Sequence, residues 1–194
     1  PGAKTLDEVL QDGREVRLCV RVDYHEQYGL RLLVTDADPA YTFGRLELRR
    51  RQTLETLRLL GLLERNRALP LPTVLQRIAV LSSEGAAGFQ DFRQHLAQNP
   101  YGFAFHCQLF STAVQGAALE PEMIAALEVV AARREQFDCV VILRGGGARL
   151  DLGGFDALEL CEAAATLPLP LFTGIGHDTD QTLLDLVAHS ALKT

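Results

Sequence analysis

The sequence predicts an α/β protein with a doubly wound, mostly parallel sheet of four to five strands, preceded by a β-hairpin. After residue 73, four short apolar runs alternate with amphipathic segments. Near-continuous apolar strands are typical of a parallel sheet that helices cover on both faces. The expected strands are 78–81, 103–110, 140–143 and 169–172, and the expected helices are 85–98, 119–135, 154–166 and a last one from about 179.

The first 40 residues follow a different pattern, which predicts the hairpin. Residues 16–22 and 30–34 alternate apolar and polar side chains, and Tyr28-Gly29 is the expected turn between them. A lone hairpin is marginally stable in water, so we expect residues 1–40 to be part of a larger sheet. Residues 41–72 are expected to hold a helix over 44–63 and a stiff proline-rich linker, and residues 73–194 to form the α/β domain.

The composition is that of a globular protein with a substantial core. Of the 194 residues, 47% are hydrophobic and 23% are charged, which excludes a disordered chain. No apolar run is long enough to span a bilayer, and the first residues do not resemble a signal peptide. The four cysteines lack the C-x-x-C spacing of zinc sites, which predicts free thiols and a cytoplasmic protein without membrane contact.

The charge is unevenly distributed along the chain. The net charge is −6, but residues 44–80 contain eight arginines and three glutamates, and residues 145–194 contain two basic and seven acidic residues. A nucleic-acid footprint is local, so the overall sign does not exclude binding of nucleic acid. The alternative, that Arg49 to Arg51 lie on a solvated helix face, stays open.

The carboxyl ends of the expected strands predict where a site would lie. In doubly wound sheets, ligands bind outside these ends. The loops that follow the expected strands all carry polar residues or glycines, and they cover residues 82–85, 111–116, 144–147 and 174–180. We therefore expect a polar site built from these four loops.

Arg144 and the three glycines after it are typical of a phosphate-binding loop. Successive glycine N–H groups can form an anion-binding nest, and an arginine adds a fixed charge that suits phosphate. The loop is neither a Walker A motif nor a dinucleotide fingerprint. A merely flexible connection remains the alternative. The residues that we expect to bind phosphate are Ser82, Ser83, Gly145, Gly146 and Gly147.

His177 is the strongest candidate for proton transfer. It lies between an expected strand end and a helix start, beside glycine and carboxylates. Asp178 with Gln181 resembles a capping box, and Asp180 suits the first turn of a helix whatever its function. Asp91 is expected on the helix after the first central strand, where it looks like an ordinary surface aspartate.

Four motifs in sequence order resemble the large subunit of exonuclease VII, over roughly residues 24–194. The motifs are residues 77–83 with Ala86, Ala87 and Asp91; residues 114–116; residues 144–147 with Asp151 and Leu152; and residues 176–180 with Asp185, Val187 and Ala188. Two positions depart from the family pattern. Ala148 stands where a serine is usual, and Asp178 replaces the commoner glutamate beside the histidine.

The resemblance implies an exodeoxyribonuclease that hydrolyses single-stranded DNA to short oligonucleotides, in a complex with exonuclease VII small subunits. It implies catalytic roles for Asp91, Arg144, His177 and Asp180. It also implies an OB-fold at the N-terminal end, with the hairpin as its last strands. No cofactor and no tight metal site are expected, and Mg²⁺ is the one ion left open.

Two other functions stay open at this point. Doubly wound sheets also serve as nucleotide- or phosphate-binding modules without hydrolysis. The chain could equally be an assembly segment that is inactive on its own, and self-association is left open as well.

Overall fold

The computed structural model describes residues 15–144, 149–176 and 181–192. Its contacts divide the chain into two compact units, Pro1–Arg51 and Gln52–Thr194. The helix α2 crosses this boundary, and each unit is described by itself.

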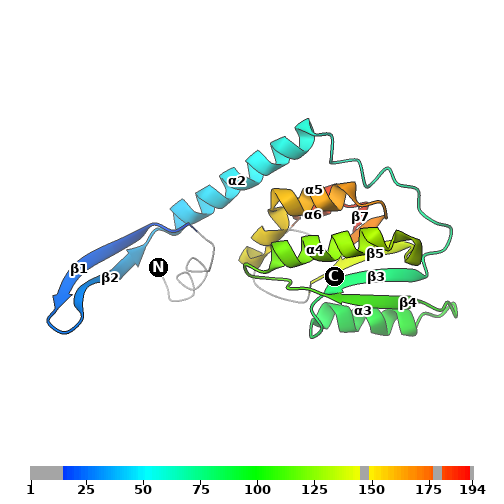
Figure 1. Ribbon diagram of the computed structural model, residues 1–194, viewed down its shortest axis with the longest axis horizontal. Coiled ribbons are helices and arrows are strands. Elements are labelled where there is room, and N and C mark those ends of the chain that lie inside the picture. Colours follow the sequence, from blue (N-terminus) through cyan, green and yellow to red (C-terminus); the bar gives the residue numbers. More distant parts are fainter. Residues whose placement is uncertain (1–14, 145–148, 177–180, 193–194) are drawn as a thin grey trace. The chain divides into compact units, whose positions relative to one another are not determined.

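The first unit contains an antiparallel hairpin of β1 (Leu18–His25) and β2 (Gly29–Ala37) (Figure 1). Both strands are longer than the alternation predicts. Gly29 has φ of +70°, a conformation that glycine adopts without strain, so it suits the start of the return strand. The predicted hairpin is confirmed, whereas its membership of an OB-fold stays a prediction.

One face of this hairpin is apolar and exposed. Its three cross-strand pairs join Val20 to Val34, Val22 to Leu32, and Tyr24 to Leu30. In the described part of the chain, all six side chains are exposed to solvent. Contiguous apolar surface of this kind is uncommon on soluble proteins and often marks an interface.

The helix α2 (Pro39–Leu59) starts earlier than the sequence predicts. The sequence predicts a helix over 44–63, and the observed helix begins five residues earlier. The Tyr41 N–H donates to Asp38 Oδ1 at 3.2 Å, so Asp38 caps the helix. Proline is tolerated in the first turn because its missing N–H has no helical partner there.

The second unit contains a five-stranded, all-parallel sheet in the order β4-β3-β5-β6-β7. The predicted α/β class and strand number are confirmed. The two-residue strand β7 is too short for its sequence to predict. The strands are β3 (Arg77–Ser82), β4 (His106–Ser111), β5 (Cys139–Leu143), β6 (Leu171–Gly174) and β7 (Ser190–Ala191).

Helices cover both faces of this sheet (Figure 1). On one face, Ile78 and Val80 pack with Phe89 of α3. On the other face, the alternate residues Ala79 and Leu81 pack in the larger core, which α4, α5 and α6 complete. The helical elements are α3 (Ala87–Ala97), α4 (Leu119–Ala132), η1 (Arg134–Gln136), η2 (Arg149–Asp156), α5 (Leu158–Thr166) and α6 (Leu183–Val187).

The four cysteines are free thiols in three kinds of environment. Cys139 and Cys161 are buried in the two cores, Cys107 is half-buried and Cys19 is exposed. Burial raises the pKa of the Cys139 thiol to about 12 and also raises that of Cys161. These two thiols are therefore uncharged packing groups at neutral pH.

Asn66 joins the segment after α2 to the connection between α5 and β6. Its side chain is fully buried. Its Nδ2 group donates to the carbonyls of Ala164, Leu167 and Leu169 at 3.4, 3.2 and 3.0 Å. Its Oδ1 atom accepts the Leu171 N–H at 2.9 Å, at the start of β6. One side chain thus satisfies four backbone groups in the interior.

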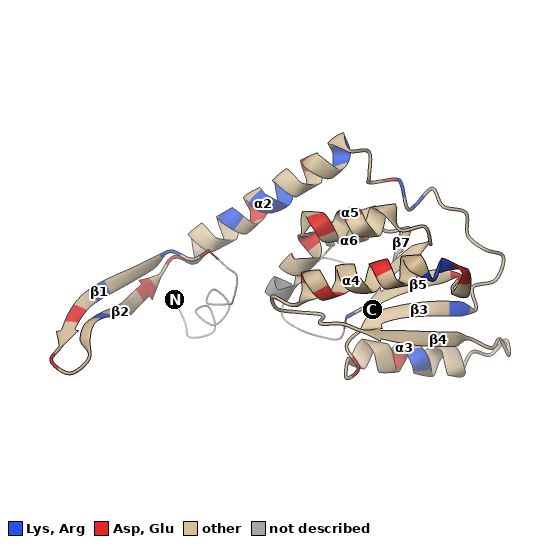
Figure 2. Ribbon diagram, viewed as in Figure 1, with Lys and Arg blue, Asp and Glu red and all other residues tan. Residues whose placement is uncertain are grey.

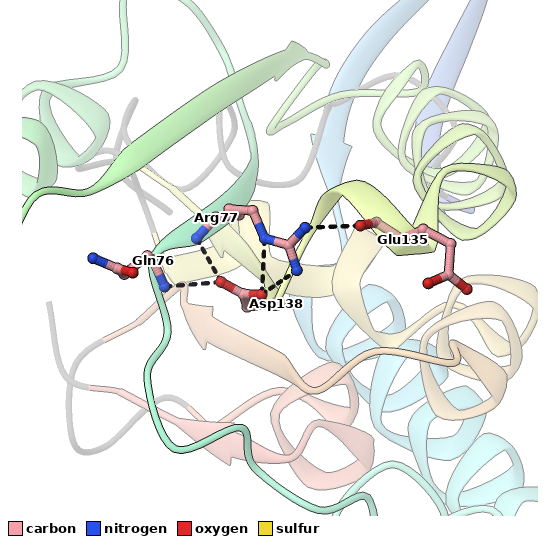
Figure 3. Close-up of polar contacts among 4 residues, drawn as sticks. All are labelled: Gln76, Arg77, Glu135 and Asp138. Carbon is pink, nitrogen blue, oxygen red and sulfur yellow. Dashed lines mark hydrogen bonds and ion pairs between the residues drawn. The ribbon is translucent and has the colours of Figure 1, made fainter.

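Asp138 joins the amino ends of β3 and β5 (Figure 3). Its Oδ1 accepts from the Arg77 guanidinium at 2.6 and 3.0 Å, and its Oδ2 accepts from the N–H groups of Gln76 and Arg77 at 3.0 and 2.7 Å. Arg77 also donates to the Glu135 carbonyl at 2.8 Å. Burial alone would raise the pKa of Asp138, but these hydrogen bonds hold it below its ordinary value of 3.8.

Asp138→Asn is expected to lower the Tm of the chain by about 5 °C at pH 7, because charge-assisted hydrogen bonds are lost. A carboxylate with a lowered folded-state pKa contributes stability above its unfolded pKa and loses it as the pH falls through the folded value. The difference in Tm between the two proteins should therefore shrink between pH 5 and pH 3. An equal difference at both pH values in thermal melts would contradict this role.

Candidate nucleic-acid hydrolysis site

The sheet topology places a switch point between the carboxyl ends of β3 and β5. From β3 the chain passes outward to β4 on one side, and then returns to build β5, β6 and β7 on the other. The direction in which the chain adds strands to the sheet reverses between β3 and β5. The connections that leave these two strands therefore run to opposite faces of the sheet. Such a switch point is where doubly wound sheets bind their ligands.

Two predicted site residues lie directly at this point. Ser82 is the last residue of β3, and Arg144 follows β5. The register pairs Leu81 with Ile142 near the ends of these neighbouring strands. The Arg144 N–H donates to the Gly174 carbonyl at 3.0 Å, which joins this point to the end of β6. The structure thus brings the loops after β3, β5 and β6 together.

The Ser82 hydroxyl is buried without a hydrogen-bond partner among the described residues. The side chain has no exposed surface. Buried hydroxyls are nearly always paired, so this one is unusual for a protein interior. That Ser82 binds phosphate stays a prediction.

Arg144 is 6% exposed, which is unusual for a guanidinium. A buried arginine needs anionic or carbonyl partners, and its fork of N–H groups matches the oxygens of a phosphate. Gly145, Gly146 and Gly147 lie outside the described residues. Of the predicted anion-binding loop, the structure therefore describes only the first residue, Arg144.

His177 and Asp180 also lie outside the described residues, but the structure fixes both sides of their segment. Before it, Ile175 is buried after β6. After it, α6 is capped by Thr182 in a capping box with Asp185. We expected Asp178 with Gln181 to cap this helix. That prediction is wrong for α6, because the later Thr182–Asp185 pair begins it.

Asp185 ties α6 to β6 in the interior. It is 7% exposed, and its Oδ1 accepts from Thr173 Oγ1 at 2.5 Å. Its Oδ2 accepts from the N–H and the hydroxyl of Thr182, each at 2.8 Å. The Leu183 N–H donates to Asp156 Oδ1 at 2.6 Å. This network holds the helix start that follows the segment of His177 and Asp180.

Asp91 lies on the exposed side of α3. Its neighbours Phe89 and Phe92 face the sheet, and its own carbonyl contacts His95 Nδ1 at 2.9 Å. Its carboxylate has no hydrogen bond or ion pair within the described residues. A catalytic role for Asp91 stays a prediction.

Several basic residues lie along α2 (Figure 2), namely Arg45, Arg49, Arg50, Arg51 and Arg58. Arg51 pairs with Glu47 and Arg58 with Glu55 on the exposed helix surface. Such pairs neutralise part of the local positive charge and contribute little to stability. They favour the interpretation of this region as a solvated helix face.

Neither a metal centre nor a membrane span is found in the part of the chain that the structure describes. No three side chains of His, Cys, Asp or Glu come close enough there to bind a metal ion. No helix within those ranges combines the length and the apolar character that crossing a bilayer requires.

Sequence reasoning missed Asn66 and the structural role of Asp185. Asn66 contacts backbone groups only, and these have no sequence signature. The Thr182–Asp185 pair has the spacing of a capping box and was readable in the sequence, but Asp178 and Gln181 compete for the same interpretation.

Comparisons with known proteins agree with the geometry. A family model described as exonuclease VII, large subunit, matches residues 62–194. The chain is 37% identical to the exodeoxyribonuclease 7 large subunit of Deinococcus radiodurans, over 95% of this chain and 45% of that protein. It is 33% identical to the protein of the same name from Rhodopirellula baltica, over 96% and 42%.

The chain therefore spans less than half the length of these curated relatives. The family model nevertheless covers well over half of the chain, including all the loops at the carboxyl edge of the sheet. On this evidence, the chain belongs to the exonuclease VII large subunit family.

Proposed function

We propose that the chain is the central part of an exodeoxyribonuclease that hydrolyses single-stranded DNA to short oligonucleotides, in a complex of large and small subunits. The observation that carries this proposal is the switch point between β3 and β5. There the buried Arg144 and the buried Ser82, whose hydroxyl has no partner among the described residues, end neighbouring strands at the carboxyl edge of the sheet. The names of the relatives support the activity.

In this proposal the β3 and β5 loops bind the scissile phosphate. Arg144 and the N–H groups of Gly145 to Gly147 contact its non-bridging oxygens, and Ser82 and Ser83 donate hydroxyl hydrogen bonds. These donors stabilise the charge that builds on the phosphoryl group in the transition state. A site that is already buried strengthens these contacts, because water competes less for the phosphate oxygens.

His177 and Asp180 share the proton transfers. One group takes a proton from the attacking water, and the other donates a proton to the leaving sugar oxygen. Asp91 would orient one of them or bind a metal ion. An Mg²⁺ ion would be held by oxygen ligands, which the Asp91 carboxylate and the substrate phosphate can supply.

His177→Ala in the assembled enzyme is expected to lower the hydrolysis rate by about 100-fold, because a general acid or base is removed. The wild-type rate should be bell-shaped in pH, since one group must be protonated and another deprotonated. The measurement is the initial rate on end-labelled single-stranded DNA from pH 5 to pH 9.

His25→Ala in the hairpin is the matched control and should retain wild-type rates. A His177→Ala enzyme with near-normal turnover would remove this histidine from the chemistry. Release of short oligonucleotides also decides against the non-hydrolytic phosphate-binding alternative, which the comparisons do not favour.

A further inference from the structure

Three aromatic residues lie close together in the loop before β4, which is an edge strand of the sheet. Tyr101 is 81% exposed and Phe103 is 53% exposed, and Phe105 is half-buried. The ring centroids of Tyr101 and Phe103 lie 6.3 Å apart, and those of Phe103 and Phe105 lie 6.5 Å apart. Successive planes are tilted by 42° and 63°, so each ring offers its own face.

The loop that carries these rings is held rigidly by Asn99. The Asn99 amide donates to the carbonyls of Leu96 and Phe103, both at 2.8 Å, and its oxygen accepts the Phe103 N–H at 3.1 Å. Gly102 adopts φ of +71°, which a side chain would disfavour. The exposed rings are therefore held in place by hydrogen bonds although the core does not cover them.

A cation and two amides lie beside the rings. Phe103 and Phe105 form one side of a groove, and Gln90, Arg93 and Gln94 of α3 form the other. Arg93 lies over the Phe89 ring at 5.6 Å. Within the described residues it has no carboxylate partner, and no acidic side chain lines the groove.

We propose that this surface, defined by Arg93, Tyr101, Phe103 and Phe105, binds a stretch of single-stranded nucleic acid. Bases stack on the exposed rings, Arg93 contacts a phosphate, and the glutamines hydrogen-bond to base edges. Aromatic faces beside a cation are the elements with which proteins bind single strands without sequence preference. The proposal rests on the proposed function, to which it adds a binding surface outside the hydrolysis site.

The surface lies at the amino ends of the strands, whereas the candidate hydrolysis site lies at their carboxyl ends. The six residues of β4 separate these two ends by about 20 Å, at roughly 3.3 Å per residue. The far end of β4 lies beside Ser82, because Ser111 and Ser82 are register partners. A strand bound on the rings therefore contacts the protein several nucleotides away from the bond that is cleaved.

The test is the binding of a fluorescently labelled 20-nucleotide oligothymidylate to the chain, measured by anisotropy at low salt. Phe103→Leu and Tyr101→Leu keep apolar bulk but remove the ring, and each is expected to weaken binding about 5- to 50-fold. Arg93→Gln should weaken binding and reduce its salt dependence. Asn99→Ala should weaken binding while it retains all three rings, because the loop is no longer held.

Arg133→Gln and Val129→Ala on α4 are the matched controls and should leave the affinity unchanged. An abasic strand of the same length should bind wild type and Phe103→Leu equally. The proposal would be overturned if the chain did not bind the oligothymidylate, or if the control variants lost as much affinity as the ring variants. It would also be overturned if the ring variants bound as tightly as wild type while their thermal melts showed that they are folded. Binding is read without cleavage, so an inactive His177→Ala enzyme that still shows the ring effect would separate the two proposals.

Discussion

Arg144→Ala is expected to lower the rate of single-stranded DNA hydrolysis by the assembled enzyme about 10²- to 10³-fold. Arg144 is buried at the switch point, so in the proposed function its charge would act on the phosphate with little screening by water. Most of the loss should appear in kcat, because the charge on the phosphoryl oxygens grows towards the transition state. The measurement is the initial rate on end-labelled oligonucleotides at saturating substrate, with and without a chelator.

Two further variants make this result specific. Arg144→Lys should recover only part of the rate, because an ammonium group cannot donate the paired hydrogen bonds of a guanidinium. Arg133→Gln removes an exposed arginine from the end of α4 and should leave kcat unchanged. If Arg144→Ala loses no more activity than Arg133→Gln, the switch point is not the place of hydrolysis.

Asn66→Asp is expected to lower the free energy of unfolding by about 3 kcal/mol or more. The amide group that donates to the carbonyls of Ala164, Leu167 and Leu169 would become an oxygen that repels them. A carboxylate in a fully buried position also has to be desolvated or protonated. The measurement is urea unfolding followed by circular dichroism at pH 7.

Asn66→Ala should destabilise the chain less than Asn66→Asp, because it leaves four backbone groups unpaired but adds no charge. Arg65→Ala, at the exposed neighbouring position, should have no measurable effect. Because a carboxyl can be protonated, the Asn66→Asp protein should regain part of its stability as the pH is lowered towards 5. Equal stability of the Asn66 and Arg65 variants would show that the buried amide contributes nothing.

The central sheet could be predicted because its strands are nearly continuous apolar runs. Residues 78–81 and 140–143 needed only their composition, since both faces of these strands are buried. Element ends were harder to predict. A proline such as Pro39 is compatible with the end of a strand and with the start of a helix. Here it starts a helix, because the Asp38 side chain accepts a hydrogen bond from the first helical turn.

The candidate site was predictable where a loop follows a strand directly, as at Ser82 and Arg144. Topology then adds what the sequence lacks, because only the strand order shows that these two loops leave neighbouring strands in opposite directions. Asn66 gives no sequence signal at all. It stands between Arg65 and Arg67, where an isolated asparagine looks like a solvated residue, and its partners are main-chain atoms about 100 residues further on.

The distance along the chain between Asn66 and its partners also bears on the order of folding during synthesis. The four hydrogen bonds join residues that are 98 to 105 positions apart. At ribosomal rates of about 5–20 residues per second, Asn66 waits roughly 5 to 20 seconds for them. Until residues 164–171 have been synthesised, the Asn66 side chain has none of these four partners. The segment after α2 thus gains its attachment to the connection between α5 and β6 only late in the synthesis of the domain.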